Sequence, residues 1–251
     1  MEISDIIENS LKFPMDNLKP LGIYIGLYLL IAILVIFSIV GLISAVIISP
    51  SMVIVSVILL ILALIVYFII GGYQVEVIKT GVNHENIVPS IQFKETFILG
   101  IKAFIVAFIY MLIPIIIMSI LFIATAGLSS LTSLTSTNPE VVLTGLGILI
   151  PIGIILFIIF SFIHFMANGR LAETDSLGYA LNIPEAVRDI SRIGVGKVIV
   201  TVLVLVIILI AVSGILHMIP FVGSVISIVV TPYLIFTLNR GNGLLYADVK
   251  E

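Results

Sequence analysis

Six long apolar runs, none with a formal charge in its middle, constrain this chain more than any other feature of its sequence. Each run has about 18 residues or more, and an α-helix needs about 20 to cross ~30 Å of hydrocarbon. We therefore predict an all-α fold, a polytopic integral membrane helical bundle with six transmembrane helices. The predicted spans are Leu21 to Ile48, Met52 to Ile70, Phe97 to Ala126, Val141 to Met166, Val198 to Met218 and Phe221 to Leu238.

Composition supports the same class. Of the 251 residues, 61% are hydrophobic and only 10% are charged, whereas about 25% of the residues of a soluble domain are charged. No polar segment reaches the roughly 50 residues of a second domain, so we predict a single domain over residues 1–251. The net charge of −3 comes without a basic stripe, which argues against a nucleic-acid partner. Cysteine is absent, which excludes disulfides and thiol catalysis.

A charged stretch from Gly169 to Lys197 separates two of these runs. Its eight acidic and basic side chains cannot lie in hydrocarbon, so the stretch must lie at or beyond a membrane surface. All eleven Lys and Arg residues of the chain fall on the same side of the six predicted spans as this stretch. The positive-inside rule therefore predicts a cell-membrane protein with both termini in the cytoplasm. These cations are Lys12, Lys19, Lys79, Lys94, Lys102, Arg170, Arg188, Arg192, Lys197, Arg240 and Lys250.

The chain also shows a weak internal repeat, with hairpin-like units at about 1–81, 82–175 and 176–251. Each unit has a charged, amphipathic lead-in segment, two spans joined by an uncharged outer link, and an exit marked by Gly or Asn. The exits are GGYQVEVIKTG, NGRLAETDSLG and NRGNGLLYADV, and the last of these is a strong turn signal. True structural repetition is one explanation. The other is that three apolar hairpins look alike by composition alone.

The lead-in segments are typical of short interfacial helices on the cytoplasmic side. In the third segment, Ala186 and Ile190 share one helical side, while Arg188, Asp189 and Arg192 take the other. Such helices can hold membrane lipid phosphates or a membrane-protein partner. The alternative is that these cations only keep the loops inside the cell. The candidate contact residues are Lys94, Lys102, Arg188, Arg192 and Lys197.

Few residues inside the spans suggest a site. Pro114 and Pro151 lie inside spans three and four, where they can kink a helix and free carbonyl groups toward a cavity. Gly22 and Gly26 form a GxxxG pair, which predicts a close contact between helices.

No pattern for catalysis or nucleotide binding is present in the sequence, and the three histidines are too far apart in sequence to suggest a metal site. We therefore predict a protein that is not an enzyme and that uses no cofactor.

A resemblance adds to this interpretation. The segment GYQVEVIKTGVNHENIVPSIQFKETFILGIKAFIVAFIY resembles a family of archaeal integral membrane proteins known as domain of unknown function 4013. The resemblance implies six helices in a prokaryotic cell membrane and transfers no activity. The matching positions are Gly72, Tyr73, Val77, Ile78, Gly81, Pro89, Phe93, Gly100, Lys102 and Ala103.

Two functions fit these features. The first is a non-enzymatic scaffold or accessory subunit that binds partners or lipid headgroups on its cytoplasmic face. The alternative is a transporter of a small solute or a lipid, with a site between the repeats. The transporter hypothesis predicts a polar cavity at the seam between repeats, and the scaffold hypothesis does not require one.

Overall fold

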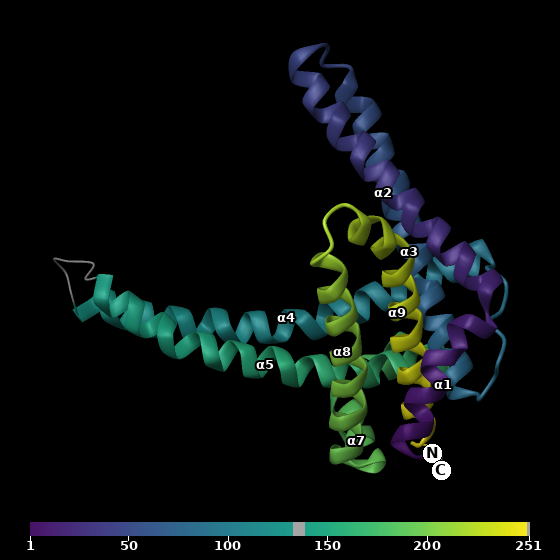
Figure 1. Ribbon diagram of the computed structural model, residues 1–251. Helices are drawn as coiled ribbons and strands as arrows, with labels where there is room; N and C mark the ends of the chain where they lie inside the picture. The colour runs from purple at the N-terminus through teal and green to yellow at the C-terminus, as the bar shows by residue number, and fades with distance from the viewer. Residues whose placement is uncertain (133–138, 250–251) are drawn as a thin grey trace.

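The structure is a computed structural model that describes residues 1–132 and 139–249. These residues form helices joined by short links, which confirms the all-α class (Figure 1). The helices are α1 (Ile3–Asp16), α2 (Leu18–Ile47), α3 (Met52–Val82), α4 (Phe93–Thr132), α5 (Pro139–Thr174), α6 (Leu177–Ala180), α7 (Ile183–Ile193), α8 (Val195–His217) and α9 (Val222–Ala247).

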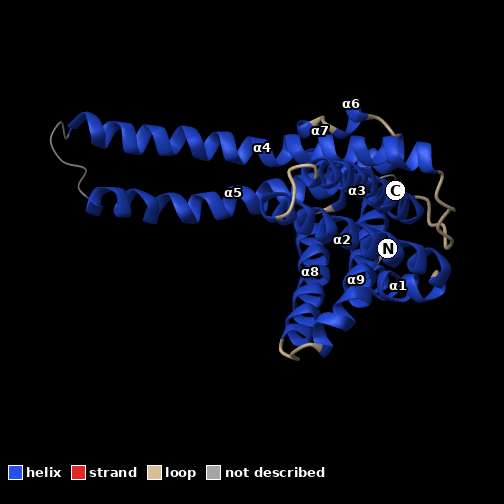
Figure 2. Cartoon of the chain, turned by 90° about the horizontal axis from the view of Figure 1, so that it is seen from above, coloured by secondary structure: helices blue, strands red, loops and turns tan. Residues whose placement is uncertain are grey.

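Six of these helices, α2, α3, α4, α5, α8 and α9, are long and apolar enough to cross a membrane, as predicted. They form three hairpins, α2–α3, α4–α5 and α8–α9, which diverge from a common centre (Figures 1 and 2). At this centre α3, α5 and α9 contact one another. We call the inner ends of these three helices, with α1, α6 and α7, the hub. We call the α2–α3 and α4–α5 hairpins the arms.

The three helices at the hub continue two to three turns beyond the ends predicted for their spans. We placed those ends at residues 70, 166 and 238, whereas α3, α5 and α9 end at residues 82, 174 and 247. Gly71-Gly72 and the Asn239–Gly243 segment are therefore helical, and interpreting them as breaks was wrong. Glycine serves here for close packing. A Cβ atom at Gly72 would lie 1.8 Å from the carbonyl oxygen of Thr96.

The lead-in segments differ from one another in structure. The first forms α1, which packs on α8 and α9 within the hub. Ile6 and Phe13 are among its buried side chains. The third forms α7, which begins at a side-chain cap, because Asn182 accepts a hydrogen bond from the backbone N–H of Glu185. The second forms no helix of its own, since α4 begins directly at Phe93. The location of α1 and α7 at a membrane interface stays a prediction. The structural equivalence of the three units also stays a prediction.

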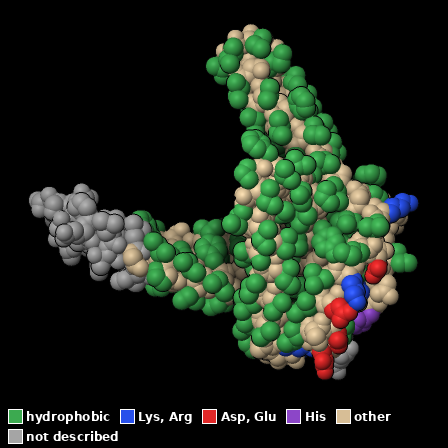
Figure 3. Space-filling view, in the orientation of Figure 1, with side chains coloured by type: hydrophobic (Ala, Val, Ile, Leu, Met, Phe, Trp, Pro, Cys, Tyr) green, Lys and Arg blue, Asp and Glu red, His purple; other side chains and the backbone are tan. Residues whose placement is uncertain are grey.

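Side chains of different types gather in different parts of the molecule. In Figure 3 hydrophobic side chains cover the α2–α3 arm and the described part of the α4–α5 arm, while charged side chains gather on the hub. The described residues do not form the predicted GxxxG contact, because a Cβ atom at Gly22 or Gly26 would meet none of their atoms within 4 Å. The close contact lies elsewhere. A Cβ atom at Gly100 of α4 would lie 1.7 Å from the carbonyl oxygen of Phe68 on α3.

We predict that Gly100→Ala destabilises the fold by about 1–3 kcal/mol, because the added methyl group forces two backbones apart. The matched control is Gly26→Ala, which meets open space and should be neutral or slightly stabilising in a helix. Thermal unfolding of both variants in detergent measures the difference. Equal stability of the two variants would show that α3 and α4 do not pack this closely.

Candidate functional site

Four of the five predicted contact cations pair with carboxylates in the structure. The Lys102 ammonium lies 2.6 Å from the Asp175 carboxylate and donates a second hydrogen bond to the Asp175 carbonyl. Lys197 lies 2.5 Å from the Asp248 carboxylate. Lys94 is exposed and forms no ion pair within the described residues. Lys94 is thus the predicted contact residue that can reach an external anion without displacing a carboxylate.

On α7 the remaining two cations form a small network. Arg188 pairs with Glu185, and Arg192 pairs with Asp189 at 2.8 Å and with Glu185 at 3.5 Å. The pairs to Glu185 are half exposed, and such pairs contribute only about 0–1 kcal/mol each. Their role in binding headgroups stays a prediction, because an incoming phosphate must compete with these carboxylates.

Asp189 is fully buried, although the helical pattern of α7 placed it on the charged side. The reason is Arg170 of α5, whose Nη1 donates to Asp189 Oδ2 at 2.7 Å and whose Nε donates to the Tyr179 carbonyl at 2.9 Å. This ion pair fastens α7 to α5. Sequence reasoning missed this pair. Its signal was an arginine at the start of a polar exit segment, a position where a buried carboxylate can pair with the guanidinium.

Arg240 of α9 is the largest fully buried side chain of the hub. Its Nε donates to Asn9 Oδ1 at 3.0 Å, and its Nη1 donates to the Glu85 carbonyl at 2.6 Å and to Thr80 Oγ1 at 3.2 Å. The guanidinium also lies 4.2 Å from the centre of the Phe13 ring, in a cation–π contact. One side chain therefore ties α9 to α1, to α3 and to the link after α3.

A pocket of about 110 Å³ lies where helices of all three hairpins meet, and we call it the seam pocket. Its floor and walls come from α3, α4, α5 and α9. Most of the lining is apolar, with amide, imidazole and phenol groups among it. The lining residues are Tyr67, Gly71, Gln74, Val75, Ile78, Gly100, Ala103, Phe104, Ala107, His164, Asn168 and Asn239.

Two polar atoms of the seam pocket are buried without a hydrogen-bond partner among the described residues. They are Nε2 of His164 on α5 and Nδ2 of Asn239 on α9. Gln74 is satisfied differently, since its amide donates to the hydroxyl of Tyr24 at 2.7 Å. Apart from His164, the described lining has no acidic or basic side chain. The pocket offers hydrogen bonds in neutral surroundings, and its lining has no activated nucleophile.

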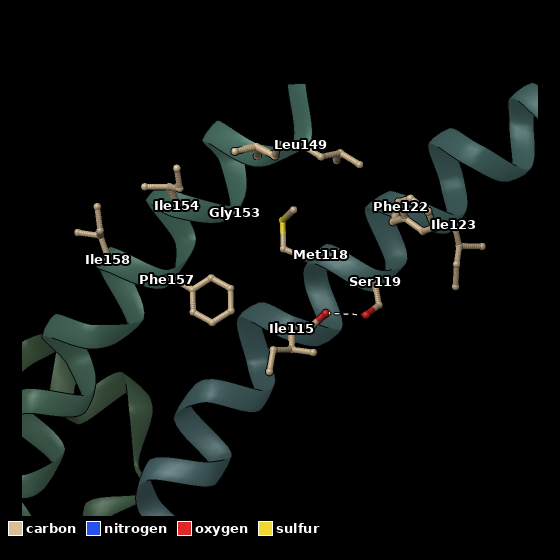
Figure 4. A pocket seen from close by; sticks show the side chains of 11 residues that line it. Ile115, Met118, Ser119, Phe122, Ile123, Leu149, Gly153, Ile154, Phe157 and Ile158 are labelled. Atoms are coloured by element: carbon tan, nitrogen blue, oxygen red, sulfur yellow. Dashed lines mark hydrogen bonds between the residues drawn. The ribbon is translucent and has the colours of Figure 1, made fainter. Parts of the chain in front are cut away.

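The two candidate prolines lie elsewhere. Pro114 is buried inside α4 and Pro151 is exposed on α5, and neither lines the described pockets. Next to them an open groove of about 810 Å³ runs between α4 and α5 (Figure 4). Among the described lining residues the one hydroxyl, on Ser119, donates to the Ile115 carbonyl of its own helix at 2.8 Å. The described lining of the groove is therefore apolar, and it offers no free polar group of the kind that a transport site requires.

The comparisons with known proteins agree with the resemblance noted in the sequence. Residues 55–222, about two thirds of the chain, match the family described as protein of unknown function DUF4013. The chain belongs to the DUF4013 family. No curated protein and no solved structure matches it. The matched region includes Gln74, His164 and Asn168 of the seam pocket, while Asn239 and Arg240 lie beyond it.

For this DUF4013 protein we predict that Asp189→Asn destabilises the fold by about 3–5 kcal/mol, because it leaves the Arg170 guanidinium buried without its counter-charge. The comparison variant is Arg188→Gln, which removes an exposed partner on the same helix and should cost less than about 1 kcal/mol. Chemical unfolding in a fixed detergent measures both. Similar losses in the two variants would contradict a structural role for the buried pair.

Proposed function

We propose that this chain is a multi-pass protein of an archaeal cell membrane, with the hub and both termini in the cytoplasm. The distribution of Lys and Arg supports this orientation, since the outer links have none. The structure adds that the Met1 ammonium lies 3.0 Å from the Asp248 carboxylate, so the two ends share one side of the hub.

The absence of cysteine makes this orientation testable with single-cysteine variants. We predict that Ser51→Cys, at the exposed outer end of the α2–α3 arm, reacts with a membrane-impermeant maleimide added to intact cells. Ser90→Cys, in the exposed link between α3 and α4, should react only after the cells are lysed. The opposite pattern would invert the topology.

We further propose that the protein is a non-enzymatic scaffold or accessory subunit that holds a membrane-protein partner. One observation carries this proposal: the arms diverge, so the faces that helices normally bury in a bundle remain uncovered (Figures 1 and 2). Only 6% of the apolar window of α2 is buried inside the chain. Ile36 on α2 and Ile155 on α5 are more than half exposed. Helices of a partner fit such faces by close packing, and lipids fill what remains.

The hub is suited to support the arms. Buried hydrogen bonds of Arg240 and the buried pair of Arg170 hold the inner ends together. A hub fixed in this way keeps the arms in a defined arrangement, which a scaffold requires. Membrane lipids remain proposed ligands of the cytoplasmic face, and Lys94 is the residue best placed to contact a headgroup.

Site-specific photo-crosslinking tests the scaffold proposal. We expect a photoreactive residue at Ile36 or Ile155 to give a discrete protein adduct in native membranes. The same residue at the fully buried Tyr110 should give no intermolecular adduct. Adducts with lipid alone at both exposed positions would reject a stable protein partner and leave lipid as the sole occupant of these faces.

A second function, transport of a small solute or a lipid, is favoured by the seam pocket. The transporter hypothesis requires a polar cavity between the hairpins, and this pocket combines amide and imidazole groups from three helices. The apolar groove beside Pro114 and Pro151 gives no comparable support. The two functions differ in what moves: a scaffold holds its ligand in place, while a transporter carries it across the bilayer.

A further inference from the structure

The seam pocket has an aromatic side that faces outward. Tyr67 of α3 and Phe104 of α4 are 47% and 43% exposed, and both line the pocket. Their ring centres lie 6.3 Å apart in an edge-to-face arrangement. Tyr67 and Phe104 fall within the predicted spans Met52 to Ile70 and Phe97 to Ala126, so we expect their exposed rings to meet hydrocarbon in a bilayer. Two exposed aromatic side chains in contact with each other therefore border the outward side of the pocket.

Its other side is polar. His164 Nε2 and Asn239 Nδ2 are buried without partners among the described residues, and they come from different helices. Leaving a buried donor or acceptor unpaired costs free energy, so most such groups in native proteins have a partner. The Asn168 amide also lines this region. These polar groups around one pocket indicate that the pocket binds a molecule with hydrogen-bonding groups of its own.

The charge of the lining and the size of the pocket limit which ligands it can bind. The described lining contains no carboxylate, ammonium or guanidinium group that could balance a charged ligand, and burying an unbalanced charge is costly. The volume of about 110 Å³ is smaller than a 150 Å³ cavity that accepts benzene, so only a small group enters. A hydroxyl or a carboxamide both donates and accepts hydrogen bonds, which suits either tautomer of His164.

We propose that the seam pocket binds an uncharged amphiphile. Its small hydroxyl or carboxamide head hydrogen-bonds to His164 and Asn239, and its apolar tail extends along the exposed faces of Tyr67 and Phe104 toward the bilayer. Binding of this kind does not depend on the scaffold function. Transport of such a molecule rests on the second proposed function and needs an additional step, release on the other side.

The test uses the full chain in lipid nanodiscs with ¹⁵N-labelled histidine. The chain has only three histidines, and a His164→Asn variant identifies the His164 signals. The probes share a ten-carbon skeleton and differ in the head: decanamide and 1-decanol are uncharged and polar, decane has no head, and decanoate is charged. We expect decanamide and 1-decanol to shift the His164 signals saturably, and decane to leave them unchanged.

Two variants separate the site from the surrounding membrane. Asn239→Leu removes the unpaired amide and should weaken decanamide binding at least fivefold, whereas the matched control Asn86→Leu, at an exposed position outside the pocket, should not. Since Asn239→Leu can also impair folding, Ala107→Phe serves as a second variant. It fills the pocket from α4 and leaves every polar atom in place, and it should abolish the shift in a protein that elutes as wild type does.

The results that overturn the proposal are equally specific. Equal shifts from decane and decanamide would reduce the effect to partitioning into the bilayer. Tighter binding of decanoate would reject an uncharged ligand, and wild-type affinity in both pocket variants would reject the site. Measured transbilayer movement of a fluorescent decanamide in liposomes is a separate readout. Binding without movement rejects transport and keeps the site.

Discussion

Arg240 is the residue on which the arrangement of the hub depends most. Its guanidinium is buried where α9, α1 and the end of α3 meet, and its hydrogen bonds go to neutral oxygens of Asn9, Thr80 and Glu85. A buried cation that loses such acceptors is very costly, so the three partners are held in place together. The first helix and the last helix of the chain are thereby fixed against each other. The end of α3, and with it the inner end of the α2–α3 arm, is fixed to this same centre.

The spans could be predicted because one physical constraint, the thickness of hydrocarbon, sets both their length and their composition. Their inner ends could not, because the same residue type serves opposite purposes. Gly72 and Gly243 have the chemistry of a helix break, yet both lie inside helices at points where another backbone approaches within the reach of a Cβ atom. Gly22 and Gly26 form the expected contact motif, yet no atom of the part of the chain that the structure describes lies within 4 Å of a Cβ atom at either position. Whether a glycine packs against another backbone depends on which helix lies next to it. A single sequence does not give this information.

The ion pairs of the candidate site also could not be predicted from the sequence. Charge counting correctly identified the cations but not their partners, because Lys102 pairs with Asp175 and Arg170 with Asp189 across different helices. Periodicity placed Asp189 in solvent, and the buried arginine opposite reversed that placement. The residues of the seam pocket were harder to predict than these ion pairs. Gln74, His164 and Asn239 lie on three helices, each beside residues that were interpreted as the end of a span. Their common signal was an amide or imidazole near the inner end of an apolar run.

The positions of the pocket and the arms connect the two proposals physically. The seam pocket is lined by α3, α4, α5 and α9, and the arms begin to diverge at these same helices (Figure 1). A ligand in the pocket contacts the bases of both arms at once. A ligand shifts a conformational equilibrium only by the difference in its affinity for the two states. Because the pocket wall contains Gly100, where a Cβ atom would lie 1.7 Å from the Phe68 carbonyl oxygen of α3, a change in the spacing of α3 and α4 changes the pocket itself. If the pocket has different affinities for its ligand in two arrangements of the arms, its occupancy and the presentation of the arms to the proposed partner are linked, and this linkage acts in both directions.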